Sequence, residues 1–219
     1  MHALIIGGSG RTGKLVIEQL LQRGHGVTAL VRDPAVMKGL DGINIVKGSP
    51  TQISEVRQAF QDHIPDVVIV TLNAPRASDS PFAAPISPPR LMADSNANVV
   101  TAMKEFGVQK VVIMQAFGVG ASWPNMSCLL RGLMSASNMS YQYEDHNVVD
   151  KEVRASGVTY VMVRPSRLVE SDVTAVREWP NNGKGVPLMA STSRKSVACF
   201  LVDAVEESRW DNTAPVITN

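Results

Sequence analysis

The chain has 219 residues, of which 44% are hydrophobic, and its 21 Lys and Arg against 20 Asp and Glu give a formal net charge of +1 at pH 7. This size suits one domain with a buried core, and the balanced charge gives no reason to expect nucleic acid or a membrane surface as a partner. Two cysteines form no disulfide framework, and four scattered histidines lack metal-ligand spacing, so no metal site is expected. With no apolar run of membrane-spanning length, we expect a cytoplasmic protein.

Short apolar runs rich in β-branched residues alternate with longer segments of helical period. Runs of this kind are typical of parallel strands, which are covered on both faces. They predict strands over residues 3–6, 26–31, 43–46, 67–71, 110–114 and 158–163. Apolar residues at helical spacing predict the crossover helices between them. We therefore predict an α/β fold with a doubly wound, mostly parallel sheet in a single domain over residues 1–219.

A glycine-rich turn, GGSGRTGK, follows the first predicted strand. From Gly8 it approaches the P-loop of an ATPase, but Leu15 stands where that motif needs a hydroxyl for magnesium. From Gly7 the spacing is Gly7, Gly10, Gly13, which permits a tight turn, leaves room for a diphosphate at a helix N-terminus and lets helix and strand approach closely. We predict a dinucleotide-binding turn, with a purely structural turn as the alternative. The expected cofactor contacts here are Gly7, Gly8, Ser9, Gly10, Arg11, Thr12 and Gly13.

The second predicted strand ends in LVRDP, at the position that discriminates between NAD and NADP. NAD-specific folds place Asp or Glu there to bind the ribose hydroxyls. Here Arg32 comes first and Asp33 follows it. A guanidinium can donate two parallel hydrogen bonds to a 2′-phosphate, and Arg11 can close on the same group. We therefore predict NADP(H) as the cofactor; the alternative is that both arginines are surface residues without a role.

Two long segments interrupt the alternation, residues 74–95 after the fourth strand and residues 118–140 after the fifth. Both emerge at carboxyl ends of strands, where open α/β sheets bind ligands, and loops of this length are usually functional or disordered. Their apolar residues predict either a packed extension of the core or, if both of these cap insertions cover the cofactor, an apolar, Met-rich wall for a small-molecule substrate. Arg76 and Arg131 are placed to meet an anionic or phenolic group. The predicted substrate contacts are Arg76, Trp123, Met126, Leu130 and Met134.

Four stretches together carry a family resemblance: GGSGRTGK, VTALVRDP, NVVTAMKEFGVQKVVIMQAFGVG and YEDHNVVDKEVRASGVTYVMVRPSRL. Over nearly its whole length the chain resembles the atypical short-chain dehydrogenases/reductases, in particular the NAD(P)H-binding, NmrA-like group that includes biliverdin reductase B (flavin reductase). The resemblance implies a Rossmann fold and further cofactor contacts at the ends of the fourth, fifth and sixth strands. These positions are Thr71, Leu72, Asn73, Gln115, Ala116, Phe117, Pro165 and Ser166.

The chain departs from ordinary short-chain dehydrogenases, which use a Tyr-x-x-x-Lys pair. Tyr141 is followed four residues later by Asp145, and Tyr143 by Asn147. A tyrosine that relays a proton needs a nearby ammonium to lower its pKa, so the ordinary carbonyl-reductase mechanism is weakened. The biliverdin/flavin reductase type implies hydride transfer governed by placement, with the proton supplied by solvent or a peripheral group. The candidate catalytic residues are Gln115, Tyr143, His146 and Lys151.

These features predict an NADP(H)-dependent oxidoreductase that moves hydride to or from a mostly apolar, aromatic or conjugated small molecule. Two other classes stay open. One is a non-catalytic NADP(H)-binding regulator, which the missing Tyr-x-x-x-Lys pair favours; the other is a redox-neutral isomerase or cyclase on the same fold. Consumption of the cofactor would separate them. The sequence does not decide between a monomer and a homodimer.

Overall fold

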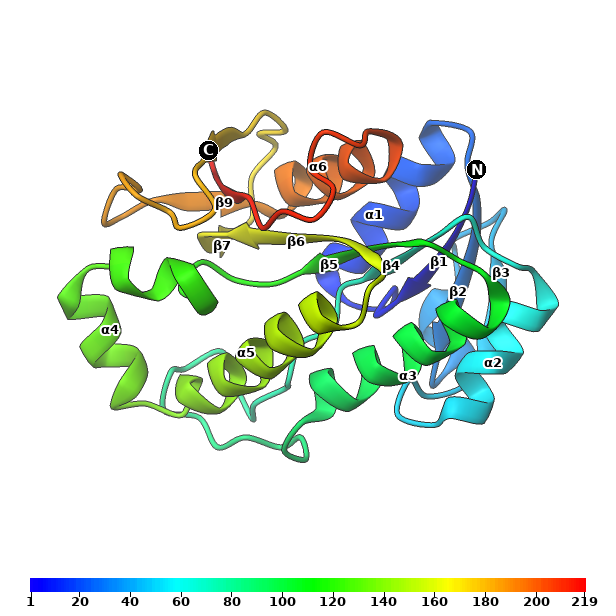
Figure 1. The fold of residues 1–219 in the computed structure, drawn as a ribbon, viewed down its shortest axis with the longest axis horizontal. Coiled ribbons are helices and arrows are strands. Elements are labelled where there is room, and N and C mark those ends of the chain that lie inside the picture. The colour runs from blue at the N-terminus through cyan, green and yellow to red at the C-terminus, as the bar shows by residue number, and fades with distance from the viewer.

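The computed structural model describes residues 1–219 and is built on an eight-stranded sheet (Figure 1). Its strand order is β3-β2-β1-β4-β5-β6-β10-β8, and all neighbours are parallel except β8, which runs antiparallel to β10. The order reverses between β1 and β4, which is where open α/β sheets bind ligands. The bounds are β1 (His2–Ile6), β2 (Gly26–Val31), β3 (Asn44–Lys47), β4 (Val67–Val70), β5 (Lys110–Met114), β6 (Thr159–Pro165), β8 (Arg177–Trp179) and β10 (Val216–Thr218).

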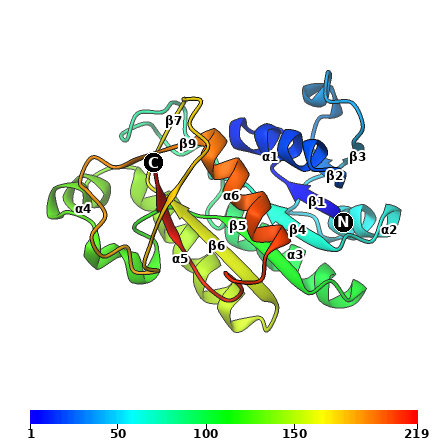
Figure 2. The same cartoon turned by 90° about the horizontal axis from the view of Figure 1, so that it is seen from above.

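Helices cover both faces of this sheet. Seen from above, α1 (Arg11–Gln22) and α6 (Arg194–Glu206) lie side by side over one face (Figure 2). The other face carries α2 (Ile53–Asp62), α3 (Leu91–Phe106) and α5 (Met139–Ala155) (Figure 1). Two clusters of 25 and 23 buried hydrophobic residues pack on the two faces, so the sheet is covered about equally on each side, as a doubly wound fold requires.

The predicted fold is confirmed: the sheet is mostly parallel, Rossmann-like and flanked by helices. Both ends of each predicted strand lie within two residues of the observed ends. The two cap insertions also follow β4 and β5. The first one is shorter than predicted, because Leu91 and Met92 form the first turn of α3 and Met92 is buried in the core. The second contains the 3₁₀ helix η2 (Gly120–Asn125) and α4 (Cys128–Ser135), which projects from the carboxyl ends of the strands (Figure 1).

The chain after β6 adds a third segment over the same edge of the sheet, and its structure was not predicted. Residues 166–193 contain β8 and a small parallel pair of strands, β7 (Arg167–Val169) and β9 (Ser191–Ser193). Each of these strands has three residues, too few for an alternating pattern to appear in sequence. No helix in the structure combines the length and apolar character that crossing a bilayer requires.

Candidate functional site

The glycine turn between β1 and α1 is shaped by two close backbone approaches. Gly7 has φ +89°, and a Cβ there would lie 2.9 Å from the carbonyl carbon and oxygen of Thr71. A Cβ on Gly13 would lie 2.8 Å from the Cα of Gly8 and closer still to the carbonyl oxygen of Gly7. Side chains at these two positions would push α1 away from β1 and β4. The turn therefore requires glycine for two of the three reasons that its spacing suggested, the tight turn and the close approach of helix and strand.

The N-terminus of α1 is open to an anion. Its N-cap is Gly10, which supplies no side chain, and its first turn holds no acidic residue. The first helical hydrogen bond runs from the amide of Lys14 to the carbonyl of Gly10 (3.0 Å), so the amides of Arg11, Thr12 and Gly13 have no acceptor. By contrast, Asp145 accepts hydrogen bonds from the first amides of α3 at 2.8 and 2.9 Å. Free amides at a helix N-terminus are suited to binding a diphosphate.

Arg32 and Asp33 have different surroundings at the end of β2. Asp33 Oδ1 accepts a hydrogen bond from the amide of Ala35 (3.0 Å) and so caps η1 (Pro34–Met37). Arg32 is exposed and makes no hydrogen bond or ion pair. The carboxylate is thus engaged in a local turn while the guanidinium is free. Arg11, by contrast, pairs with Asp79 at 3.4 Å.

The end of β4 is tied to the glycine turn and to α5. Thr71 Oγ1 donates toward the carbonyl oxygens of Ile6 (3.3 Å) and Gly7 (3.1 Å), which holds β4 against the turn. Asn73 is exposed, and its Oδ1 accepts a hydrogen bond from Gln142 Nε2 (3.2 Å). Leu72 is half-buried beside the first cluster. These three predicted cofactor contacts therefore form one continuous edge next to the glycine turn.

A buried hydrogen-bonded network holds the ends of β5 and β6. Gln115 Nε2 donates to the carbonyl of His146 (3.3 Å), and its Oε1 accepts from Arg164 Nε (3.2 Å). Arg164 is fully buried and its Nη2 lies 2.5 Å from Asp150 Oδ1. Burial lowers the pKa of Arg164, and the Asp150 carboxylate opposes that shift. Both ends of the Gln115 amide are thus engaged within the protein, which fixes its orientation.

Phe117 and Ser166, which follow β5 and β6, are held by hydrogen bonds to β6 and β9. The amide of Phe117 donates to the carbonyl of Pro165 (2.9 Å), and Ser166 Oγ shares a hydrogen bond with Thr192 Oγ1 (2.9 Å). Ala116 is half-buried between Gln115 and Phe117. The structure therefore brings the predicted contacts of the two strands together in one wall.

Tyr143 is not coupled to a lysine. Its hydroxyl donates to the carbonyl oxygen of Phe117 (2.9 Å), and burial raises its pKa above the ordinary value. Lys151 lies eight residues further along α5, but it is exposed and forms no hydrogen bond or ion pair. The phenol therefore keeps its proton in a hydrogen bond to the backbone, and no ammonium promotes its release.

His146 is buried beside the same wall. Burial and, secondarily, the charge of Arg164 lower its pKa to about 4. The imidazole makes no hydrogen bond to the protein, and His146 lines a small space together with Leu72, Asn96 and Met114. At neutral pH this ring is uncharged, so it holds no readily donated proton.

The predicted substrate residues gather mainly in one apolar cluster beyond Phe117. Met126 is buried, and Trp123, Leu130 and Met134 pack partly buried against it. Trp179 and Val186 join them from the third segment, which the sequence did not assign to the site. Arg76 is not in this cluster: its Nη1 donates to the carbonyl of Ser80 (2.8 Å), while the buried Nε atoms of Arg76 and Arg131 have no partner.

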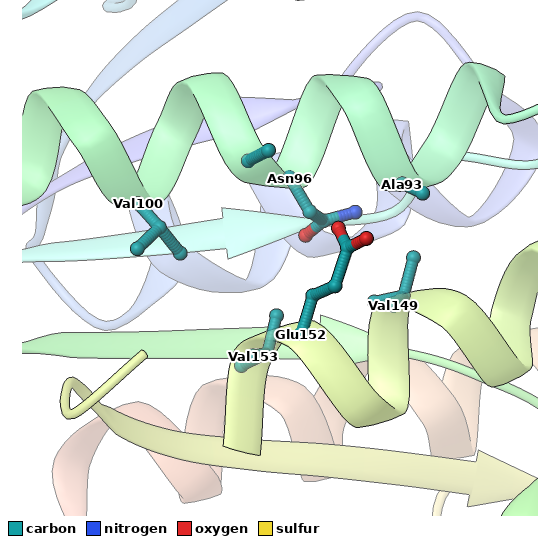
Figure 3. Close-up of a pocket in the computed structure, with 7 residues that line it drawn as sticks. Ala93, Asn96, Val100, Val149, Glu152 and Val153 are labelled. Carbon is teal, nitrogen blue, oxygen red and sulfur yellow. The ribbon is translucent and has the colours of Figure 1, made fainter. Parts of the chain in front are cut away.

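A cavity of about 160 Å³ lies between α3 and α5 (Figure 3). Asn96 borders it; the Nδ2 of this side chain donates to the carbonyl of Met92 (2.8 Å), and its Oδ1 is buried without a partner. This cavity borders the site, because Asn96 and Val149 also line the small space beside His146. None of its seven lining residues belongs to the glycine turn or to a strand end. They are Ala93, Asn96, Ala97, Val100, Val149, Glu152 and Val153.

Gly13→Ala is expected to abolish dinucleotide uptake, because the added Cβ displaces the turn from the free amides of α1. The control is Gly132→Ala in α4, where a Cβ meets no atom within 4 Å and a helix interior gains up to about 1 kcal/mol from alanine. Calorimetric titration with NADPH and NADH measures the effect. Unchanged affinity in a folded Gly13→Ala variant would contradict this account of the turn.

His146 should make the free energy of unfolding depend on pH. Its pKa is about 4 in the folded chain and ordinarily 6.5, so between these values the unfolded chain binds more protons. Stability should therefore fall as the pH falls through this window, by up to about 1.4 kcal/mol per pH unit. Urea unfolding at a series of pH values should show a flatter profile for His146→Gln. An NMR titration showing imidazolium at pH 6 would disprove the assignment.

Comparison with known proteins agrees with the geometry of the glycine turn. A family model described as NAD(P)H-binding matches residues 7–208. Divinyl chlorophyllide a 8-vinyl-reductase of Arabidopsis thaliana is 22% identical over 236 aligned positions, which cover 99% of this chain and 53% of the relative. The 3-diazoavenalumate denitrifying reductase of a Streptomyces species is 30% identical over 126 positions, which cover 57% of this chain and 41% of the relative.

The chain spans about half the length of the curated relatives it matches. Three plant relatives are named as chloroplastic, and the cytoplasmic location expected from the sequence stays a prediction.

Solved structures share the whole fold. ChuY, an anaerobilin reductase from Escherichia coli O157:H7, has a TM-score of 0.78 at 15% identity, covering 100% of this chain and 97% of its own. A short-chain dehydrogenase/reductase from Veillonella parvula, solved in complex with NADP, has a TM-score of 0.77 at 15% identity and covers 100% and 94%. With the family model matched over residues 7–208, the chain belongs to the NAD(P)H-binding domain family.

Proposed function

We propose that the chain is an NADPH-dependent reductase of the atypical short-chain dehydrogenase type, which reduces a conjugated, mostly apolar small molecule. The observation that carries this proposal is the pairing of an uncapped glycine turn with a free guanidinium, Arg32, at the end of the neighbouring strand. The turn accepts the diphosphate common to both dinucleotides, and Arg32 favours the form with a 2′-phosphate.

The environment of Asp33 supports NADPH rather than NADH as the cofactor. Asp33 is the carboxylate that would bind ribose hydroxyls in an NAD-specific fold, but it caps η1 through the amide of Ala35. This contact holds Asp33 Oδ1 at the start of η1, whereas none of the donors of Arg32 is engaged within the protein.

The nicotinamide, when bound, supplies the hydride, and this chain's residues orient the reactants. The network of Gln115, Arg164 and Asp150 keeps the ends of β5 and β6 rigid, which favours transfer by fixing distance and angle. Reduction of a conjugated double bond also takes up one proton. Because Tyr143 holds its proton with a raised pKa and His146 is neutral, we assign that proton to solvent.

The cap residues support an apolar, conjugated substrate. Aromatic and Met side chains suit flat or irregular ligands, and the cluster around Phe117 supplies Trp123, Met134 and Trp179. Two relatives are named as reductases of pigment-like molecules, divinyl chlorophyllide a and anaerobilin. Arg76 and Arg131, one from each cap insertion, would supply positive charge for an acidic substituent on such a substrate.

A second candidate function, a non-catalytic NADP(H)-binding regulator, is favoured by one observation. No group at the site is poised to donate a proton, since the Tyr143 hydroxyl is bonded to the carbonyl of Phe117 and Lys151 is exposed. A regulator needs the glycine turn and Arg32 but no proton source. Turnover decides between the two.

Steady-state oxidation of NADPH should be measured by absorbance with flavin, quinone and linear tetrapyrrole acceptors. The reductase proposal expects consumption of NADPH with at least one conjugated acceptor and a product reduced by two electrons. Tight binding of NADPH with no consumption across the panel would favour the regulator. Conversion of an acceptor with no net change in NADPH would instead indicate an isomerase or cyclase.

Arg32→Asp should weaken NADPH by on the order of 2 kcal/mol and leave NADH nearly unchanged, because only NADPH loses charge-assisted hydrogen bonds to the 2′-phosphate. Lys104→Asp is the control: it makes the same change in net charge in the last turn of α3, away from the strand ends. Dissociation constants from calorimetry provide the measurement. Equal weakening of both cofactors by Arg32→Asp would show that the 2′-phosphate lies elsewhere.

A further inference from the structure

A chain of four charged side chains crosses the open end of α1. Asp79, from the first cap, lies 3.4 Å from Arg11 Nη2, and Glu170 Oε1 lies 4.0 Å from Arg11 Nη1. The same Glu170 oxygen accepts a hydrogen bond from Arg194 Nε at 2.6 Å. The series ends on α1 itself, where Arg194 Nη1 donates to Thr12 Oγ1 at 3.4 Å. Two cations and two anions therefore border the free amides of the glycine turn.

Arg194 and Glu170, whose side chains lie 2.6 Å apart, differ in how firmly the surrounding structure holds them. Arg194 is the first residue of α6, a helix that packs against α1, and its side chain is only 12% exposed. Glu170 lies just after β7 with its side chain 67% exposed. The guanidinium is therefore held in place by the packing of two helices, whereas the carboxylate can leave it at little cost.

The position of Arg194 matches the chemistry of a diphosphate. Thr12, which accepts its hydrogen bond, also has one of the three amides that lack an acceptor. A diphosphate bound to those amides would lie within reach of the guanidinium, which can donate to two oxygens at once. A carboxylate offers the same kind of oxygen acceptors, so Glu170 and a diphosphate would use the same donors.

We propose that Arg194 binds the cofactor's diphosphate and that Glu170 occupies this guanidinium until the diphosphate displaces it. The inference rests on the proposed function only in requiring a bound nicotinamide dinucleotide. It adds to the glycine turn a cation that lies 182 positions away from Thr12 in the chain. The proposal also involves the third segment, residues 166–193, in cofactor binding, because this segment contains Glu170, the anion that competes with the diphosphate.

The two residues predict opposite effects on affinity. Glu170→Gln removes the competitor and should tighten binding roughly threefold to tenfold, while Arg194→Met removes the donor and should weaken it roughly tenfold or more. Both effects should be equal for NADPH and NADH, because the diphosphate is common to the two. This equality separates Arg194 from Arg32, whose removal acts on NADPH alone.

Asp172→Asn is the matched control for Glu170→Gln. Asp172 lies two residues further along the same exposed segment and pairs with Lys195, the neighbour of Arg194. The substitution makes the same change in net charge but releases a lysine rather than Arg194. It should change neither dissociation constant by more than about twofold, since exposed ion pairs contribute little.

Dissociation constants of the wild-type chain and the three variants, with thermal unfolding to verify folding, test the proposal. Tighter binding in Glu170→Gln and weaker binding in Arg194→Met, equal for both cofactors, support it. If the wild type binds NADPH and the dissociation constant of Glu170→Gln or of Arg194→Met equals the wild-type value, the inference is wrong and the proposed function stands. If the wild type binds neither dinucleotide, both are wrong.

If Arg194→Met does not fold, Arg194→Lys replaces it in the test, and Glu170→Gln, at an exposed position, is still measured. Lysine retains the charge but donates from a single point, so Arg194→Lys should weaken binding less than tenfold yet measurably. In a chain that carries Arg194→Lys, Glu170→Gln should tighten binding by a smaller factor than it does in the wild-type chain, because the two residues are coupled. Strict additivity would show that Glu170 does not act through Arg194.

Discussion

The close approach of α1 to the carboxyl ends of β1 and β4 is the constraint on which the rest of the site depends. It exists because Gly7 and Gly13 leave no Cβ between the helix and the strands, and Thr71 then ties β4 to the turn. The approach directs the free amides of Arg11, Thr12 and Gly13 toward the point where the strand order reverses. The diphosphate site that we propose, and the role that we propose for Arg194 in it, both depend on where that helix begins.

Most of the fold could be predicted because its strands are buried on both faces. A strand such as β4, with the sequence Val-Val-Ile-Val, is apolar throughout, whereas a strand with one solvent-exposed face alternates apolar and polar residues. The segment after β6 could not be predicted, because β7, β8 and β9 are too short for a periodic pattern. Their place depends on pairing with each other and with β10, which is a tertiary property.

The candidate site was predictable in residue type but not in chemical state. The glycine spacing and the Arg32–Asp33 pair were visible in sequence, yet only the cap of η1 shows that Asp33 is engaged. In the YEDHN stretch, Asp145 caps α3 and Tyr143 donates to the backbone. Arg194 had no local signal at all, because its relation to Thr12 depends on α6 packing against α1.

The same burial that organises the strand ends also limits their acid–base chemistry. Removing Tyr143 and His146 from water raises the pKa of the first and lowers that of the second, so each is held in its neutral form. With Tyr143 and His146 both neutral and no lysine beside the phenol, the wall lacks the proton donor that a Tyr-x-x-x-Lys pair gives to a developing oxyanion. It can hold a conjugated acceptor, in which charge spreads over many atoms, at a fixed distance from a hydride donor. For the reductase function that we propose, this arrangement favours an extended double-bond system over an isolated ketone as the acceptor.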